Sequence, residues 1–266
     1  MMHRVLALAV AVVAAFASRS AAAAPRWIDR AMTQPRLVFQ GDAGIGVGHL
    51  GRAGAPSWNG PGLNLEGAIG VTDKVELGLR TGIRMSTEAR AIQADYYGRT
   101  LWTETWGTGG STFANPEARV RWAFYSGNVA EIGLDGRLYL PFETGTRIGG
   151  MIGVPFAIHA SDFLRIDTGV YLPFAFTQDT FFALSIPGYF WFQPNEKLFL
   201  GPMVSMRFVD PGPGSGDAGL LLGFGLGYQV ASAVDLKTWF LFPDVTESGN
   251  IRRFGGGFGV AFRIGE

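Results

Sequence analysis

Basic residues recur two or four positions apart in three neighbouring stretches of the chain, and this spacing could bind anions. They are Arg80 and Arg84, then Arg119 and Arg121, and finally Arg137. In a β-strand such positions lie on one face, because successive side chains point to opposite sides. Rows of arginine bind carboxylate or phosphate groups and make membrane channels selective for anions. These arginines are therefore candidates for solute selectivity.

Acidic residues on the same face of these stretches support a competing interpretation. They are Glu76, Glu117, Glu131 and Asp135, and each could form an ion pair with one of the arginines. A buried network of such pairs adds little stability and only fills the interior of the fold. The sequence leaves both interpretations open, selectivity and filling.

The other reactive side chains form no pattern that points to catalysis. Neither His49 nor His159 has a serine or aspartate at a spacing typical of a hydrolase. The chain has no cysteine, and no group of His, Asp and Glu has the spacing of metal ligands. The glycines of residues 44–48 precede no helix that could bind a phosphate. We expect neither an enzyme nor a cofactor or metal site.

The composition indicates a hydrophobic chain of the membrane type. Of its 266 residues, 47% are hydrophobic and 17% are charged, and the net charge is zero, whereas soluble domains have about 25% charged residues. A neutral chain also lacks the basic surface that a nucleic-acid-binding protein needs. Past the N-terminal region, no apolar stretch is long enough for a transmembrane helix. The hydrophobicity must therefore lie on strands.

Apolar and polar residues alternate along twelve segments, as they do in strands with one apolar and one polar face. In the third segment, Val75, Leu77 and Leu79 alternate with Glu76 and Arg80. The twelve segments are 37–48, 63–71, 75–85, 117–125, 129–140, 147–158, 164–174, 181–192, 198–209, 219–230, 234–242 and 253–264.

The links between these segments alternate in length. Residues 72–74, 126–128 and 231–233 are short turns, whereas 49–62 and 86–116 are long links rich in Gly, Pro and Asp. Most segments have nine to twelve residues, close to the 9–11 that a tilted strand needs to cross a bilayer. Short turns at one rim and long loops at the other are typical of outer-membrane barrels. The sequence predicts an all-β, monomeric, transmembrane antiparallel up-and-down β-barrel of about 12 strands.

The residue types on the two faces of these segments distinguish such a barrel from a soluble β-sandwich. Every Asp, Glu, Lys and Arg of the twelve segments lies on the polar side, and so do most of the strand glycines. A polar, glycine-rich face suits the crowded concave lumen of a barrel, whereas the outer face of a soluble sheet usually avoids glycine. Aromatic residues of the apolar side gather at strand ends, as in the two interfacial girdles of membrane barrels.

The N-terminal region is typical of an export signal. Arg4 precedes an apolar run over residues 6–17, and small residues at 21–23 suit a cleavage site. We therefore expect a signal peptide at 1–23, a periplasmic N-terminal segment at 24–36 and the barrel at 37–266. Both ends of the barrel would face the periplasm of a Gram-negative cell. The expected partners are outer-membrane lipid and the outer-membrane assembly machinery, with no nucleic acid.

The turn and strand over residues 72–79, Thr-Asp-Lys-Val-Glu-Leu-Gly-Leu, resembles a recurring phrase of small outer-membrane β-barrels of Gram-negative bacteria. That group includes narrow solute porins and transporter-type barrels, among them those labelled phenol-degradation meta-pathway proteins. The resemblance covers the mature chain and is architectural, so it implies an outer-membrane location and names no solute. Such barrels commonly end on an aromatic residue, whereas this chain places Phe262 four residues before its last, Glu266.

The lumen and the longest loop suggest two functions. Passive or weakly selective passage of a small polar or anionic solute would use the lumen. A closed barrel could instead act as a structural or surface-contact protein through loop 86–116, which carries Tyr96, Tyr97, Trp102 and Trp106. A soluble periplasmic β-sandwich binding protein is a third alternative. The sequence does not decide whether the loop enters the barrel.

Overall fold

The computed structural model describes residues 25–52, 55–84, 113–140, 149–175, 181–210, 217–242, 245–246 and 253–265. The signal predicted over 1–23 lies outside the described residues, and so do the loop aromatics Tyr96, Tyr97, Trp102 and Trp106. In the part of the chain that is described, no helix has the length and apolar character to cross a membrane.

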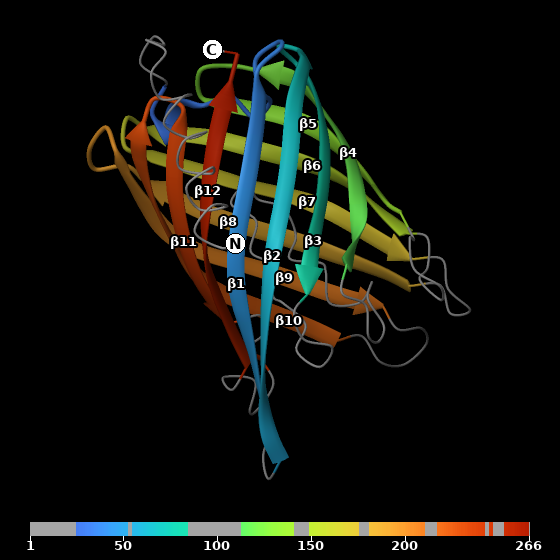
Figure 1. Cartoon of the computed structure of the whole chain (residues 1–266). Helices are drawn as coiled ribbons and strands as arrows, with labels where there is room; N and C mark the ends of the chain where they lie inside the picture. Colours follow the sequence, from blue (N-terminus) through green and yellow to red (C-terminus); the bar gives the residue numbers. More distant parts are fainter. Residues whose placement is uncertain are drawn as a thin grey trace.

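Twelve antiparallel strands of the described chain close into one barrel, in which each strand pairs with its sequence neighbours and β1 pairs with β12 (Figure 1). This confirms the predicted fold class. The strands are β1 Phe39–Arg52, β2 Ala55–Thr72, β3 Val75–Arg84, β4 Phe113–Ser126, β5 Ala130–Tyr139, β6 Gly149–Ser161, β7 Leu164–Ala175, β8 Phe181–Phe192, β9 Leu198–Asp210, β10 Asp217–Ala231, β11 Val234–Phe242 and β12 Arg253–Ile264. A short 3-10 helix, η1, spans Trp27–Asp29.

The long link predicted over residues 49–62 is wrong. β1 continues to Arg52 and β2 begins at Ala55, so the two strands form one extended hairpin that projects beyond the barrel in Figure 1. The reason is pairing on both sides: Leu50 of β1 lies opposite both Trp58 of β2 and Arg253 of β12. The glycines and prolines of this region had suggested a loop, but the ladder of β1 holds them in strands. Loop 86–116 is also shorter than predicted, because residues 113–116 already belong to β4.

The two faces of the strands lie as predicted. Leu79 and Ile152 on the apolar face are 55% and 59% exposed on the outside, whereas Arg121 and Asp135 are buried inside. One closed barrel with charges inside and apolar residues outside is not a sandwich, so the soluble β-sandwich alternative is wrong. The apolar outer face is suited to lipid.

Glycines of the inner face make room for large side chains that lie flat on the wall. A Cβ at Gly153 would approach the ring of Tyr171 to 2.1 Å, and a Cβ at Gly257 would approach Trp239 to 2.4 Å. Both distances are far shorter than a van der Waals contact. The concentration of glycine on the inner face is therefore a packing requirement of the lumen, as the sequence had suggested.

The turns of one rim are short and made by local hydrogen bonds. The hydroxyl oxygen of Thr72 accepts from the backbone N–H groups of Lys74 and Val75 between β2 and β3. The side-chain oxygen of Asn195 accepts from those of Lys197 and Leu198 between β8 and β9. Such side-chain turns reverse the chain in a few residues, and we call this end of the barrel the short-turn rim.

The outward side chains give a test of lipid contact. We expect Leu79→Arg, in the middle of β3, to lower the free energy of unfolding in lipid vesicles by about 2–4 kcal/mol, since an arginine near the bilayer midplane costs that much. Val129→Arg is the matched control, because Val129 lies in a short turn, where the cost is about 0–1 kcal/mol. Equal losses for both variants, measured by urea titration, would contradict a lipid-facing β3.

Candidate functional site

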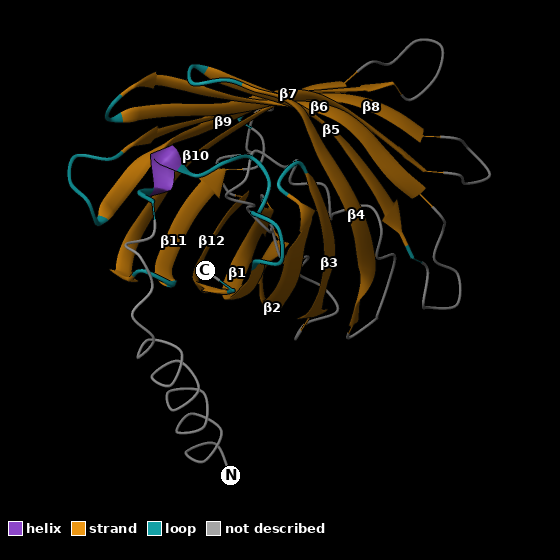
Figure 2. Ribbon diagram, turned by 90° about the horizontal axis from the view of Figure 1, so that it is seen from above, coloured by secondary structure: helices purple, strands orange, loops and turns teal. Residues whose placement is uncertain are grey.

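The lumen contains a piece of the chain as well as side chains. Residues 25–38, which we call the inner segment, run across the inside of the barrel at the short-turn rim (Figure 2). The segment turns into β1 at Leu37, whose φ of 64° lies in the left-handed region. The N–H of Leu37 donates to the carbonyl oxygen of Gly70 at 2.8 Å, and Gly70 in turn donates to Val38 at 3.1 Å. The segment predicted at 24–36 thus lies against the barrel wall, which the sequence had not indicated.

A glycine at position 70 allows this close approach. A Cβ at Gly70 would lie 2.1 Å from the carbonyl oxygen of Pro35 and 2.4 Å from that of Gln34. Those two oxygens belong to the backbone and cannot move without moving the segment. Any larger residue at position 70 would therefore push the inner segment off the wall.

Acidic side chains of β3 and β5 hold the backbone of the inner segment. Glu76 accepts a hydrogen bond from the N–H of Gln34, and Glu131 accepts one from the N–H of Met32, each at 3.0 Å. Arg121 of β4 donates to the carbonyl oxygen of Met32 at 3.3 Å. Glu131, a predicted lumen residue, therefore lies in the wall and contacts the inner segment.

The opposite side of the segment is held by β6, β7 and β11. Arg30 forms two hydrogen bonds with Asp235, at 2.6 and 3.0 Å, and its carbonyl oxygen accepts from Arg165. One ring nitrogen of His159 lies 2.9 Å from the carbonyl oxygen of Ile28, and the other lies 3.2 Å from Glu131. His159 thus links the segment to the wall.

The start of the segment is tied to the rim outside the strands. Arg26 pairs with Asp29 at 2.7 Å and donates to the carbonyl oxygen of Asp162 in the β6–β7 turn at 2.9 Å. The hydrogen bond to Asp29 raises the pKa of the Arg26 guanidinium above its ordinary value. This pair is exposed, so it adds little to the hold on the segment.

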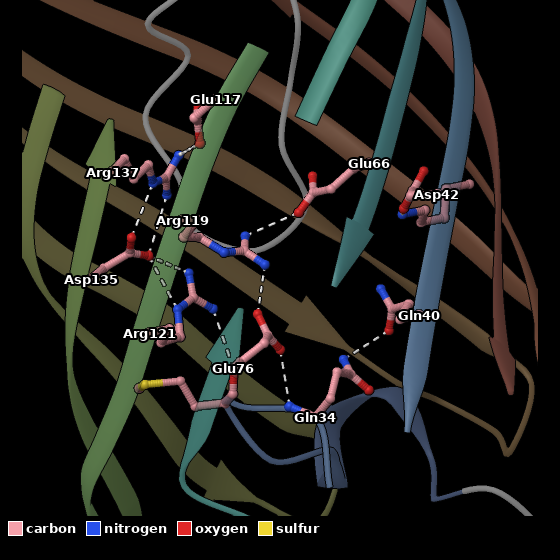
Figure 3. A network of polar contacts seen from close by, with 12 residues as sticks. Gln34, Gln40, Asp42, Glu66, Glu76, Glu117, Arg119, Arg121, Asp135 and Arg137 are labelled. Atoms are coloured by element: carbon pink, nitrogen blue, oxygen red, sulfur yellow. Dashed lines mark hydrogen bonds and ion pairs between the residues drawn. The ribbon is translucent and has the colours of Figure 1, made fainter. Parts of the chain in front are cut away.

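The predicted arginines of β4 and β5 meet four carboxylates in two groups of ion pairs, which together we call the arginine network and which Figure 3 draws. Its members are Arg119, Arg121, Arg137, Glu66, Glu76, Glu117 and Asp135. Asp135 joins the two arginines of one group: its oxygens lie 2.7 Å from Arg121 and 3.1 Å from Arg137. Because the side chain of Asp135 has no exposed surface, these charges interact away from bulk water.

Arg119 and Arg137 each contact two acidic side chains, whereas Arg121 contacts one acidic side chain and the inner segment. Arg119 bridges Glu66 at 3.0 Å and Glu76 at 2.5 Å, while Arg137 reaches Glu117 at 3.1 Å. The arrangement is therefore a chain of compensated charges, closer to the filling interpretation than to a row of free arginines.

Two further predicted arginines, Arg80 and Arg84, belong to β3. Arg80 is half-buried on β3, and the strand register places it opposite Glu66 of β2 and Glu117 of β4. The side chain of Arg84 is outside the described part of the structure. Both lie further from the short-turn rim than Glu76 does, because β3 runs away from that rim.

An apolar surface, which was not predicted from the sequence, lies on the other side of the lumen. We call it the aromatic wall; it comprises Tyr189, Trp191, Phe199, Met203, Leu221, Trp239 and Leu241, and the inner segment adds Trp27 and Ile28. The wall belongs to β8–β11, which lie across the ring of strands from β2–β5 (Figure 2). A signal was present, since the inner face of β8 carries no charged residue and includes Tyr189 and Trp191.

Empty space remains between the inner segment and the wall. A cavity of about 70 Å3, partly open to solvent, borders Met32, Gln40, Glu76, Arg121 and Arg165. Among the described residues, no group of three or more His, Asp or Glu side chains could hold a metal ion. The lumen can therefore bind through hydrogen bonds and ion pairs on one side and through aromatic contacts on the other.

Comparisons with known proteins identify the fold. No family model matches the chain, and no curated protein matches its sequence. The NanC porin has a similar structure, with a TM-score of 0.58 and 11% identity over 84% of this chain and 100% of that chain.

Two further structures agree. An outer-membrane channel from Pseudomonas putida F1 matches with a TM-score of 0.57 and 9% identity over 87% of this chain and 97% of that chain. The KdgM porin matches at 0.51 and 9% identity over 82% of this chain and 98% of that chain. At these identities the likeness shows the fold alone. The chain has the fold of the small porin-like β-barrels of the outer membrane.

Proposed function

We propose that this chain is a passive outer-membrane channel for a small polar or anionic solute. One observation carries the proposal: a closed barrel presents apolar residues outside and buries charged residues on its inner face. A barrel that only had to be stable could fill its interior with apolar side chains, since buried ion pairs add little stability. In this proposal the short-turn rim and both termini face the periplasm, after removal of residues 1–23 as an export signal.

The inner segment is the barrier in this proposed channel. It crosses the lumen at the short-turn rim and is bound by strands on both sides, so a solute must pass it or displace it. Arg30 and Asp235 form the ion pair that holds it to β11. Weakening this pair should favour the conducting state.

Planar-bilayer recordings of the double variant Arg30→Gln with Asp235→Asn test the proposal. Replacing both partners leaves no lone buried charge, so the barrel should fold and spend a larger fraction of time open than the wild type. The matched control is Arg26→Gln with Asp29→Asn, which removes an exposed pair from the same segment and should behave as wild type. Silence from folded wild type and from both variants would contradict a channel.

The second candidate is the closed structural barrel, and one observation favours it. The inner segment and the arginine network together occupy much of the lumen near the short-turn rim. In that case the recordings above would be silent, and any contact function would lie outside the barrel, with loop 86–116 as the first candidate.

Within the channel proposal, Arg80 and Arg84 set a weak preference for anions. In a salt gradient, we expect Arg80→Gln with Arg84→Gln to shift the reversal potential toward the equilibrium potential of the cation. The reason is that Glu66 and Glu117, which lie opposite Arg80, would then dominate the local charge. The control is Arg36→Gln with Lys74→Gln, which removes two charges from exposed positions at the short-turn rim. An unchanged reversal potential would show that these arginines only fill the lumen and do not select ions.

A further inference from the structure

Trp27 of the inner segment lies in a well-formed aromatic site. Its indole ring stacks parallel on Phe199 of β9, with ring centroids 4.5 Å apart and an interplanar angle of 3°. Trp191 of β8 meets the same indole edge-on, at 5.9 Å and 74°. Only 3% of Trp27 is exposed, and the inner segment also buries Ile28, Met32 and Val38. The indole of Trp27 is therefore the aromatic anchor of that segment.

The barrel builds this site without help from the inner segment. Phe199 lies opposite Gly227 of β10, and a Cβ at Gly227 would come within 2.0 Å of the Phe199 ring. The glycine lets Phe199 lie flat on the wall with its free face toward the lumen. Trp191 stands nearly perpendicular to Phe199, at 75° and 6.0 Å. Two fixed rings at a right angle form a corner that accepts one flat ring.

The remaining sides of the corner are apolar on the barrel side and cationic on the segment side. Met203, Leu221 and Leu241 belong to the same buried cluster. The guanidinium of Arg30 lies 5.0 Å from the centroid of the Trp27 ring, in cation–π contact. Parallel stacking and edge contacts on aromatic rings each contribute about 0.5–1.5 kcal/mol beyond the area that is buried. The site therefore favours planar aromatic groups over other apolar groups of similar size.

We infer that this corner is a binding site for a small planar aromatic solute, which competes with Trp27 and thereby releases the inner segment. Trp27 is the ligand that the protein supplies to itself. A tethered group acts at an effective concentration in the millimolar range when its linker is short. A solute that reaches a comparable concentration in the lumen can displace it. Only the consequence, opening of the lumen, rests on the proposed channel function; the binding site does not.

Binding is tested by calorimetric titration of the full-length, detergent-folded protein with indole. We expect Trp27→Ala to bind indole at least about tenfold more tightly than the wild type, because the tethered competitor is gone. Adding Phe199→Ala to that variant should abolish saturable binding. Adding Phe192→Ala instead, which removes an outward ring of β8, should leave binding intact. No saturable binding by Trp27→Ala, or equal binding of glucose, would overturn the aromatic site.

A second measurement does not depend on the Trp27→Ala variant. The chain has no cysteine, so Met32→Cys places one thiol on the buried side of the inner segment. Millimolar indole should accelerate its labelling by a maleimide several-fold, and tryptamine and indole-3-acetate show which charge on the ring is preferred. An unchanged labelling rate would overturn the competition. Faster labelling without any conductance would instead leave the site in place and contradict the channel.

Discussion

Asp135→Asn is expected to lower the free energy of unfolding by about 3–5 kcal/mol, the largest loss from any single polar substitution in the lumen. Asp135 accepts hydrogen bonds from Arg121 at 2.7 and 3.1 Å and from Arg137 at 3.1 and 3.4 Å, and its side chain is fully buried. Asparagine keeps the size but not the charge, so both guanidinium groups lose a counter-ion. Removing one partner from a buried pair typically costs about this much.

Urea titration of vesicle-refolded protein, followed by tryptophan fluorescence, measures this loss. Asp29→Asn is the matched control, because Asp29 pairs with Arg26 at an exposed position and such pairs contribute about 0–1 kcal/mol. A loss below about 1 kcal/mol for Asp135→Asn would show that water screens the arginine network. The arginines would then be available to a passing solute, and the selectivity interpretation would replace filling.

Fixing the inner segment to the wall should abolish conductance completely. Gln34 of the segment donates a hydrogen bond to Gln40 of β1 at 3.0 Å, so cysteines at these two positions lie within reach of a short, disulfide-forming bifunctional reagent. The protein has no native cysteine, and the reagent therefore reacts only at the introduced pair. We expect channel events before the bridge forms, none afterwards, and full recovery when a reductant cleaves it.

The single variants Gln34→Cys and Gln40→Cys serve as controls, since each reacts with the reagent without forming a bridge. They should continue to conduct after treatment. Undiminished current through the bridged protein, with the bridge verified by mass spectrometry, would mean that ions pass beside the inner segment and that its movement is irrelevant to conduction.

Alternation was sufficient to predict all twelve strands, but not all of their ends. The bounds of β8, β11 and β12 agree with the predicted segments 181–192, 234–242 and 253–264. In each strand successive side chains face lipid and lumen in turn, which imposes a period of two. The outer part of the β1–β2 hairpin was not predicted, because its glycines and prolines are typical of a loop. The pairing of β1 with β2 and with β12 keeps it extended.

The contacts of the site needed the three-dimensional structure. The sequence placed Arg121 and Asp135 on the inner face, but their pairing depends on the register of β4 and β5. That register shifts at a bulge between Ala123 and Tyr125, next to the turn, and a one-residue slip would change every partner. The inner segment has one short 3-10 turn and no period, and it meets the wall through residues as distant as Asp235, 205 positions from Arg30.

That last separation has a consequence for biogenesis. Arg30 precedes the first strand and Asp235 belongs to the eleventh, so the ion pair between them cannot form until nearly the whole polypeptide has been delivered to the membrane. The first and last strands join at about the same stage, when the twelfth is in place. Closure of the barrel between β1 and β12 and binding of the inner segment in the lumen therefore belong to one late step. A molecule released before that step would have an open barrel and no segment in its lumen.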